Sequence, residues 1–128
     1  MSKENWCSFI IGDMTFEYDK EKNEANIKKH GISFEIAARV FFDYNRIELY
    51  DEENSDEEDR FDTIGSTLAG VPEMTMGNLH GVGEEIIFVV YTERVRRKKN
   101  GEVVEITRII SARMATSFER GLYYGKHD

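Results

Sequence analysis

The sequence predicts an α+β fold in which two N-terminal helices and one short C-terminal helix pack on an antiparallel β-sheet. Three observations support this class. Segments that alternate apolar and polar residues, as strands do, recur between residues 46 and 113. Two segments near the N-terminus and one at the C-terminus carry the residues that start and end helices. The Asn100-Gly101 pair is a strong signal for a tight turn between two antiparallel strands.

The N-terminal elements are a strand and two helices. Residues 14–18 alternate aromatic and polar side chains and predict the first strand. Asp19 suits a helix N-cap, and the following helix has acids early, bases late and Gly31 at its end. Ser33 begins a second helix over 34–42, whose apolar residues surround it almost completely, so this helix should be buried.

The remaining elements are strands followed by a last helix. Residues 46–50 and 60–66 predict two strands, and the continuous apolar run 86–92 predicts a central one. The Asn100-Gly101 turn joins residues 86–98 to residues 103–113 in a long ribbon with a basic tip. Thr116 and Glu119 form a capping-box pattern that opens the C-terminal helix. Residues 67–85 are rich in glycine and predict a loop.

Length and composition indicate one cytoplasmic domain over residues 1–128. The 128 residues, of which 40% are hydrophobic, are enough to bury a core. The single cysteine, Cys7, excludes an internal disulfide and a zinc site built from cysteines. The longest apolar run, residues 86–91, is far shorter than the ~20 residues that span a bilayer. No secretion signal or membrane segment is therefore expected.

The net charge of −8 is unevenly distributed along the chain. Residues 51–62 hold eight acidic side chains against Arg60, whereas five of the six residues in 94–99 are cationic. Because salt screens charges beyond about 8–10 Å, a local cationic surface can attract a polyanion that the whole protein repels. The net charge therefore does not decide whether the partner is a nucleic acid.

Common catalytic and cofactor motifs are absent, and no metal or cofactor is expected. The sequence has no phosphate-binding glycine loop and no nucleophile-elbow serine, and its three histidines lack metal-binding spacing. What remains is a set of cations near the ends of elements, together with a few titratable groups: Lys29, Arg60, Arg94, Arg108 and Arg113, with His30, Glu58 and Tyr91. RNA cleavage without metal needs such a set, because a base and an acid move protons while cations stabilise the phosphorane.

Each candidate also has a purely structural interpretation. His30 could be a cation at the end of a helix, and Glu58 could face solvent within the acidic run. By strict alternation Arg113 falls on the same face as residues 105, 107, 109 and 111, where it could pair with a neighbour. Arg108 falls on the opposite, more apolar face, so it needs a partner or lies at a strand edge.

The ordered segments together resemble the BrnT family of ribonuclease toxins from type II toxin–antitoxin systems. The resemblance covers roughly residues 14–124. It is carried by Phe16-Glu17-Tyr18-Asp19, Lys22, Asn26, Lys29-His30-Gly31, Ser33-Phe34-Glu35, Ala37, Val40-Phe41, Asp51, Ser55, Glu58, Arg60, Ile64-Gly65, Val89-Val90-Tyr91-Thr92, Arg94, Arg108-Ile109-Ile110-Ser111-Ala112-Arg113, Ala115, Glu119-Arg120 and Tyr123.

The resemblance implies a RelE-like fold, metal-independent cleavage of RNA, and a partner. That partner would be a small BrnA-like ribbon-helix-helix antitoxin, and operator DNA would be bound only through the toxin–antitoxin complex. Mapped onto this chain, the expected catalytic residues are His30, Glu58, Arg60, Arg94 and Arg113, and the expected RNA-binding residues are Lys29, Arg96, Arg97, Lys98, Lys99 and Arg108.

The chain departs from the family pattern in several places. Asn54 stands where members commonly have histidine, and asparagine cannot act as an acid or base. Residues 1–13 form an N-terminal extension, 71–85 a loop insertion and 94–107 an extended basic hairpin. Asn54 favours the alternative of a catalytically inactive BrnT-like protein that acts as a protein-binding or regulatory module. The retained arginines favour the enzyme, and an unrelated interaction domain is a third alternative.

Overall fold

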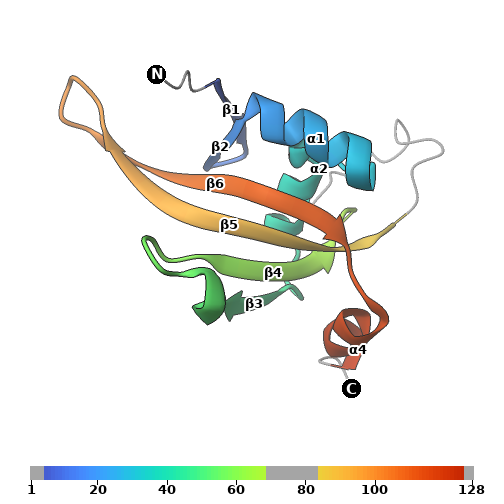
Figure 1. The fold of residues 1–128 in the computed structure, drawn as a ribbon. Helices are drawn as coiled ribbons and strands as arrows, with labels where there is room; N and C mark the ends of the chain where they lie inside the picture. The colour runs from blue at the N-terminus through green and yellow to red at the C-terminus, as the bar shows by residue number, and fades with distance from the viewer. Residues whose placement is uncertain (1–4, 69–83, 126–128) are drawn as a thin grey trace.

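The chain folds around one six-stranded β-sheet with the strand order β1-β2-β6-β5-β4-β3 (Figure 1). The computed structural model describes residues 5–68 and 84–125. The predicted insertion at residues 71–85 lies almost wholly outside these described residues. The strands are β1 (Trp6–Ile11), β2 (Met14–Asp19), β3 (Ile47–Tyr50), β4 (Phe61–Ser66), β5 (Ile86–Arg97) and β6 (Val103–Met114).

The α+β class is confirmed, but the sheet is mixed rather than wholly antiparallel. β2 pairs with β6 in parallel, while the other neighbouring strands are antiparallel. An additional strand that was not predicted, β1, lies within the 1–13 extension and pairs with β2 through a turn at Gly12. The parallel pairing depends on which distant strand β2 meets, and no local pattern specifies that. The β1–β2 hairpin is local, since the two residues Gly12 and Asp13 join Ile11 to Met14. The RelE-like assignment stays a prediction.

The first helix, α1 (Lys20–His30), begins and ends as predicted. The Asp19 side chain accepts a hydrogen bond from the Glu21 N–H at 2.9 Å. Gly31 adopts a φ of 74°, a left-handed conformation that glycine reaches without steric cost. Asn26 anchors the helix to the sheet, because its side chain exchanges two hydrogen bonds with the Ala112 backbone on β6.

The second predicted helix is divided into two parts. Ser33 caps α2 (Phe34–Ala37) by accepting from the Ile36 N–H, as predicted. The chain then tightens into a 3₁₀ helix, η1 (Ala38–Phe42), instead of continuing as an α-helix. This segment lies very close to β4, since a Cβ at Gly65 would approach the Val40 Cβ to 3.0 Å. The close approach to the sheet accompanies the change in helix geometry.

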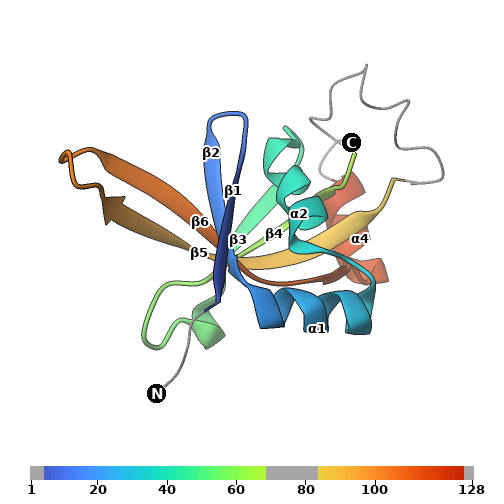
Figure 2. The ribbon, with the colours of Figure 1, turned by 90° about the horizontal axis from the view of Figure 1, so that it is seen from above.

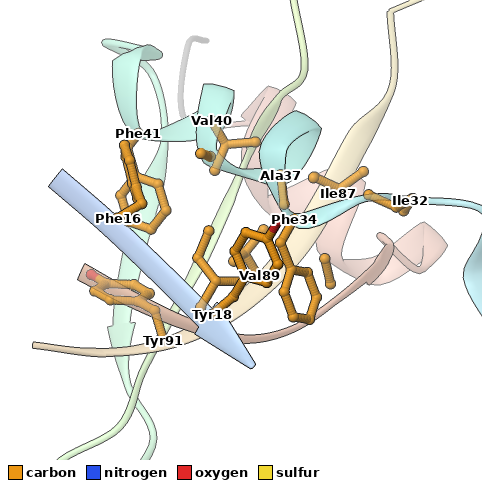
Figure 3. Close-up of a cluster of buried hydrophobic side chains, with 13 residues drawn as sticks. Phe16, Tyr18, Ile32, Phe34, Ala37, Val40, Phe41, Ile87, Val89 and Tyr91 are labelled. Atoms are coloured by element: carbon orange, nitrogen blue, oxygen red, sulfur yellow. The ribbon is translucent and has the colours of Figure 1, made fainter. Parts of the chain in front are cut away.

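The main core lies between the sheet and α1, α2 and η1 (Figure 3). Its aromatic side chains come from four elements, and the Phe41 ring meets Tyr91 edge-on at 4.8 Å and Phe16 at 5.6 Å. The buried side chains that Figure 3 labels are Phe16, Tyr18, Ile32, Phe34, Ala37, Val40, Phe41, Ile87, Val89 and Tyr91. Tyr91 is therefore a core residue, and burial raises the pKa of its phenol.

The opposite face of the sheet is covered at one end by α4 (Ser117–Gly125) (Figure 1). The predicted capping box is present, since Thr116 Oγ1 accepts from the Glu119 N–H and Glu119 Oε1 accepts from the Thr116 N–H. Tyr123 packs beneath β4 and donates to Asp43 at 2.6 Å. We call the side of the sheet opposite α1 and α2 the open face.

The ends of β5 and β6 that meet at the Asn100-Gly101 turn extend past the helices (Figure 2). We call this segment, residues 94–107, the arm.

Candidate functional site

Three arginines of β5 and β6 share the open face. Alternation along β5 places Arg94 on the side opposite the core residues Val89 and Tyr91, and Arg94 pairs with Ile106. Arg108 pairs with Thr92 and shares that side. Arg113 pairs with Phe88, and its guanidinium lies 4.1 Å from the centre of the Phe88 ring on the same side.

The position of Arg113 corrects the expectation from strict alternation, which placed it on the face opposite Arg108. The register shifts at Val90/Tyr91: Tyr91 pairs with Ile109, but Val90 pairs with Ser111. Ile110 is therefore an extra residue, and a bulge of this kind reverses the alternation beyond it. The bulge brings Arg113 to the open face with Arg108.

Arg108 is held by a buried carboxylate, as expected for an arginine on an apolar face. Its Nε donates to Glu17 Oε2 at 2.7 Å, and the Glu17 side chain is only 2% exposed. Arg96 of the arm reaches the other oxygen of Glu17 at 3.2 Å. The Arg108 guanidinium also stacks over the Trp6 ring at 3.8 Å. Neither partner was predicted, because Glu17 and Trp6 lie far from Arg108 in the sequence and meet it only across the sheet.

Glu58, Arg60 and Arg94 come together at one end of the open face. They line a cleft of about 490 Å³ with Asn54, Asp56 and Glu57. Glu58 pairs with Arg94 at 2.7 Å, and both side chains are roughly 40% exposed. A second, smaller pocket of about 80 Å³ adds Arg108 to Glu58 and Arg60, together with Trp6, Asp19 and Lys22. The structure thus unites three of the predicted arginines around Glu58, with Lys22 as an additional cation.

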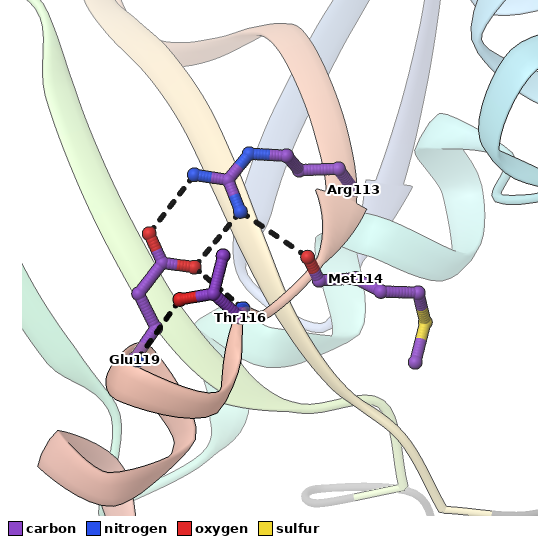
Figure 4. A network of polar contacts seen from close by, with 4 residues as sticks. All are labelled: Arg113, Met114, Thr116 and Glu119. Atoms are coloured by element: carbon purple, nitrogen blue, oxygen red, sulfur yellow. Dashed lines mark hydrogen bonds and ion pairs between the residues drawn. The ribbon is translucent and has the colours of Figure 1, made fainter.

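Arg113 lies farther along β6 and has partners of its own (Figure 4). Five residues separate it from Arg108, a distance of about 15 Å along a strand. Its guanidinium forms two parallel hydrogen bonds to Glu119, at 2.8 and 2.9 Å, and a third to the Met114 carbonyl. These bonds hold the pKa of Glu119 below its usual value and raise that of Arg113. The Arg113 guanidinium is therefore bound to Glu119 of α4.

Lys29 and His30 lie apart from this cleft. They occupy the last turn of α1, while Lys22 in the first turn is the α1 residue that reaches the small pocket. Eight residues of helix between Lys22 and His30 correspond to about 12 Å. In addition, α1 packs on the face opposite the arginines. The structure therefore does not bring His30 beside Glu58.

The basic side chains of the arm are partly neutralised. Arg96 pairs with Glu17, Lys98 with Glu102 at 3.4 Å, and Arg97 donates to the Gly101 carbonyl. Lys98 and Lys99 are exposed next to the Asn100-Gly101 turn, which has the predicted position. The Arg96 pair links the arm to the sheet.

The acidic residue Asp62 was not singled out from the sequence. Asp62 of β4 has a pKa raised to about 6, chiefly by burial and then by the charge of Asp51 and a hydrogen bond with it. Asn54, at the position where the resemblance leads us to expect histidine, donates to both oxygens of Asp51 at 3.1 Å. Asp62 is one of eight acids in residues 51–62, so only the fold distinguishes it.

Two features are absent from the described part of the chain. Within residues 5–68 and 84–125, no three or more histidine, cysteine, aspartate or glutamate side chains are grouped so as to hold a metal ion. In the same part of the chain, no helix has the length and apolar character needed to cross a membrane.

Comparison with known proteins places the chain in a family. None of the curated proteins compared with it is a match. A sequence model does match, over residues 18–119, and this range contains all of the predicted catalytic residues and the arm but neither Trp6 nor Glu17. The chain belongs to the family of that model, the ribonuclease toxins, BrnT, of type II toxin–antitoxin systems.

Proposed function

We propose that this chain is a cytoplasmic endoribonuclease toxin that cleaves RNA without a metal ion, by attack of a 2′-hydroxyl on the adjacent phosphate. The observation that carries the proposal is the grouping of Arg60, Arg94 and Arg108 around Glu58 at one end of the open face. Arginine meets a phosphate through a planar fork of donors and keeps its charge at every physiological pH. Family membership independently supports ribonuclease activity.

The roles of the individual groups follow from their positions. Arg108 is fixed by Glu17 and Trp6, so it would bind a phosphate with little loss of side-chain freedom. Arg94 would exchange its exposed pair with Glu58 for the substrate phosphate. Glu58 lies within reach of that phosphate as a proton-transfer group. His30 and Lys29 would contact only an RNA long enough to extend from the cleft to the last turn of α1. Arg113 would contact RNA only after its hydrogen bonds to Glu119 are broken.

The activity is tested with purified protein and RNA in the presence of a chelator. Cleavage should leave 2′,3′-cyclic or 3′-phosphate ends. Arg60→Ala and Arg108→Ala should each lower kcat/KM by about 10²-fold or more, as losses of transition-state electrostatic contacts do. The matched control is Arg39→Ala, because Arg39 lies in η1, on the side of the sheet opposite the open face. Cleavage that requires added magnesium and leaves 5′-phosphates would refute the mechanism.

The arm offers a separate RNA-binding surface. Replacing Arg96, Arg97, Lys98 and Lys99 with serine should weaken RNA binding and flatten its dependence on salt, because fewer counterions are released. Turnover on saturating RNA should change much less, since Arg97, Lys98 and Lys99 lie beyond the Glu58 cleft and Glu17 keeps its hydrogen bond to Arg108 when the exposed Arg96 is replaced. An unchanged affinity and salt slope would show that the arm serves another purpose.

The protein partner would be a small basic ribbon-helix-helix antitoxin of the BrnA type, and operator DNA would bind to the complex. Residues 51–59 present a run of acids beside the cleft and could steer such a partner toward it. Co-expression of a small basic protein that is encoded by the adjacent reading frame should restore growth and protect total RNA. Absence of a complex at micromolar concentrations in low salt would contradict this assignment.

The second candidate function is a catalytically inactive binding module. Two observations favour it: Asn54 replaces the expected histidine, and the arginines at the cleft and at α4 are already paired with carboxylates. An inactive module would bind its partner and leave RNA intact under all conditions. The chelator assay therefore separates the two functions directly.

A further inference from the structure

Trp6 lines the small pocket at the end of the open face. Along β1, Cys7 and Phe9 pack against the main core, so alternation turns Trp6 to the other side of the sheet. The residue is 37% exposed, and Arg108 Cζ lies 3.8 Å from the centre of its ring. Trp6 precedes residues 18–119, which match the family. The pocket therefore combines residues of the family match with an aromatic ring from the N-terminal extension.

Two cations of this pocket are suited to bind an anion. Among the residues that the structure describes, neither Lys22 nor Arg60 takes part in an ion pair. The carboxylates of the pocket have other partners, since Asp19 caps α1 and Glu58 pairs with Arg94. The pocket measures about 80 Å³, whereas a single water needs only about 10–15 Å³ of such space. It can therefore hold a small anionic group such as a phosphate, and a nucleobase would lie outside it.

The pairing of β1 places the Trp6 ring beside these cations. Trp6 pairs with Asp19, the residue that caps α1, and Lys22 follows in the first turn of that helix. The ring also contacts the Arg108 guanidinium, which the buried Glu17 holds in turn. An aromatic ring that is already ordered loses little conformational freedom when a flat ligand stacks on it.

We propose that this pocket is a nucleotide-binding subsite in which Lys22 and Arg60 bind an RNA phosphate and the neighbouring base stacks on the exposed part of the Trp6 ring. The inference rests on the proposed ribonuclease function and names a residue that positions a base beside the Glu58 cleft. Single-stranded RNA is commonly bound by stacking of its bases on aromatic side chains. Because every base has a π face, such a subsite adds affinity without a strong preference for sequence.

The test compares the binding of two single strands with the same number of phosphates. One is a short 2′-O-methyl RNA, which lacks the free 2′-hydroxyl needed for cleavage, and the other is the same backbone without bases. The wild type should bind the RNA about tenfold more tightly than the abasic chain. Trp6 is the only tryptophan of the chain, so its fluorescence reports the contact directly. The RNA should quench this fluorescence more strongly than the abasic chain does.

Variants separate stacking on a base from support of Arg108. Trp6→Leu should bind the two chains with similar affinity, and Trp6→Phe should retain part of the preference for RNA. A ring that only supports Arg108 would change the affinity for both chains equally and leave their ratio unchanged. The matched control is Tyr44→Leu, because Tyr44 is 98% exposed and lines neither the cleft nor the small pocket. This control should keep the ratio of the wild type.

The outcomes distinguish this inference from the proposed function. If the wild type yields no cyclic-phosphate ends in chelator but loses its base preference in Trp6→Leu, the subsite stands and only the ribonuclease proposal fails. If the wild type cleaves RNA but binds both chains within twofold, or if Trp6→Leu keeps the preference, only the inference is overturned. Thermal unfolding verifies that Trp6→Leu is folded. Should it unfold, equal quenching of the wild type by both chains, or a full preference in Trp6→Phe together with no quenching, would overturn the inference.

Discussion

Replacement of Glu17 by glutamine tests the strongest electrostatic contact of the open face. The Glu17 side chain is 2% exposed and lies between Arg108, 15% exposed, and Arg96, 58% exposed. Glu17→Gln keeps the size of the side chain and one acceptor oxygen but removes its charge. The Arg108 guanidinium, which stacks on the Trp6 ring, would then be a largely buried cation without a nearby negative charge.

The expected loss of unfolding free energy is about 3 kcal/mol. Breaking a buried ion pair by removing one partner typically costs about 3–5 kcal/mol, and the remaining glutamine oxygen recovers part of this. The exposed Arg96 contact adds only about 0.5 kcal/mol. With an m-value of about 1.5 kcal/mol/M, the urea midpoint should fall by about 2 M at unchanged m.

Urea unfolding followed by tryptophan fluorescence and circular dichroism measures this loss. The matched control is Glu48→Gln, which breaks the exposed Arg46–Glu48 contact, 32% and 47% exposed, and should cost about 0.5 kcal/mol or less. Arg108→Met should be far less damaging in the Glu17→Gln background than alone, because both charges are then absent. A loss below 1 kcal/mol for Glu17→Gln would refute the assignment of Glu17 as the anchor of Arg108.

Three other variants test further features of the fold. Tyr123→Phe removes the 2.6 Å bond to buried Asp43 and should lower unfolding free energy by about 1–2 kcal/mol in urea titrations; no loss would show that the bond is dispensable. Asn26→Ala deletes the anchor of α1 and should cost about 3 kcal/mol, with faster amide exchange in α1 as the check. Because folding raises the pKa of Asp62 from 3.8 to about 6, the wild type should lose stability as pH rises through this window. Asp62→Asn should reduce that loss by about 1 kcal/mol after allowance for solvent screening, and an identical pH dependence would contradict it.

The candidate site was predictable in its residue types but not in its grouping. Arg60, Arg94 and Arg108 stand out as cations near strand ends, and the structure brings them together around Glu58. His30 stands out equally from the sequence but lies at the far end of α1. Asp62 has no local signature, since its properties come from burial and from Asp51, Arg113 and Glu119 on three other segments.

The sequence by itself determined the features that depend on neighbours within a few residues. The Asp19 and Ser33 caps, the αL glycine at Gly31, the Thr116–Glu119 capping box and the Asn100-Gly101 turn all lie where the local pattern predicts. Each uses hydrogen bonds or dihedral angles of one short segment, so its free energy is specified by the residues of that segment alone.

Only the tertiary structure decided which segments meet. The parallel pairing of β2 with β6 joins residues about 90 positions apart, and the bulge at Ile110 follows from the register between β5 and β6. A shift of one residue in register moves a side chain to the other face, so alternation alone misplaced Arg113. The open face with its arginines exists because burial of the aromatic core on the other side fixes that register.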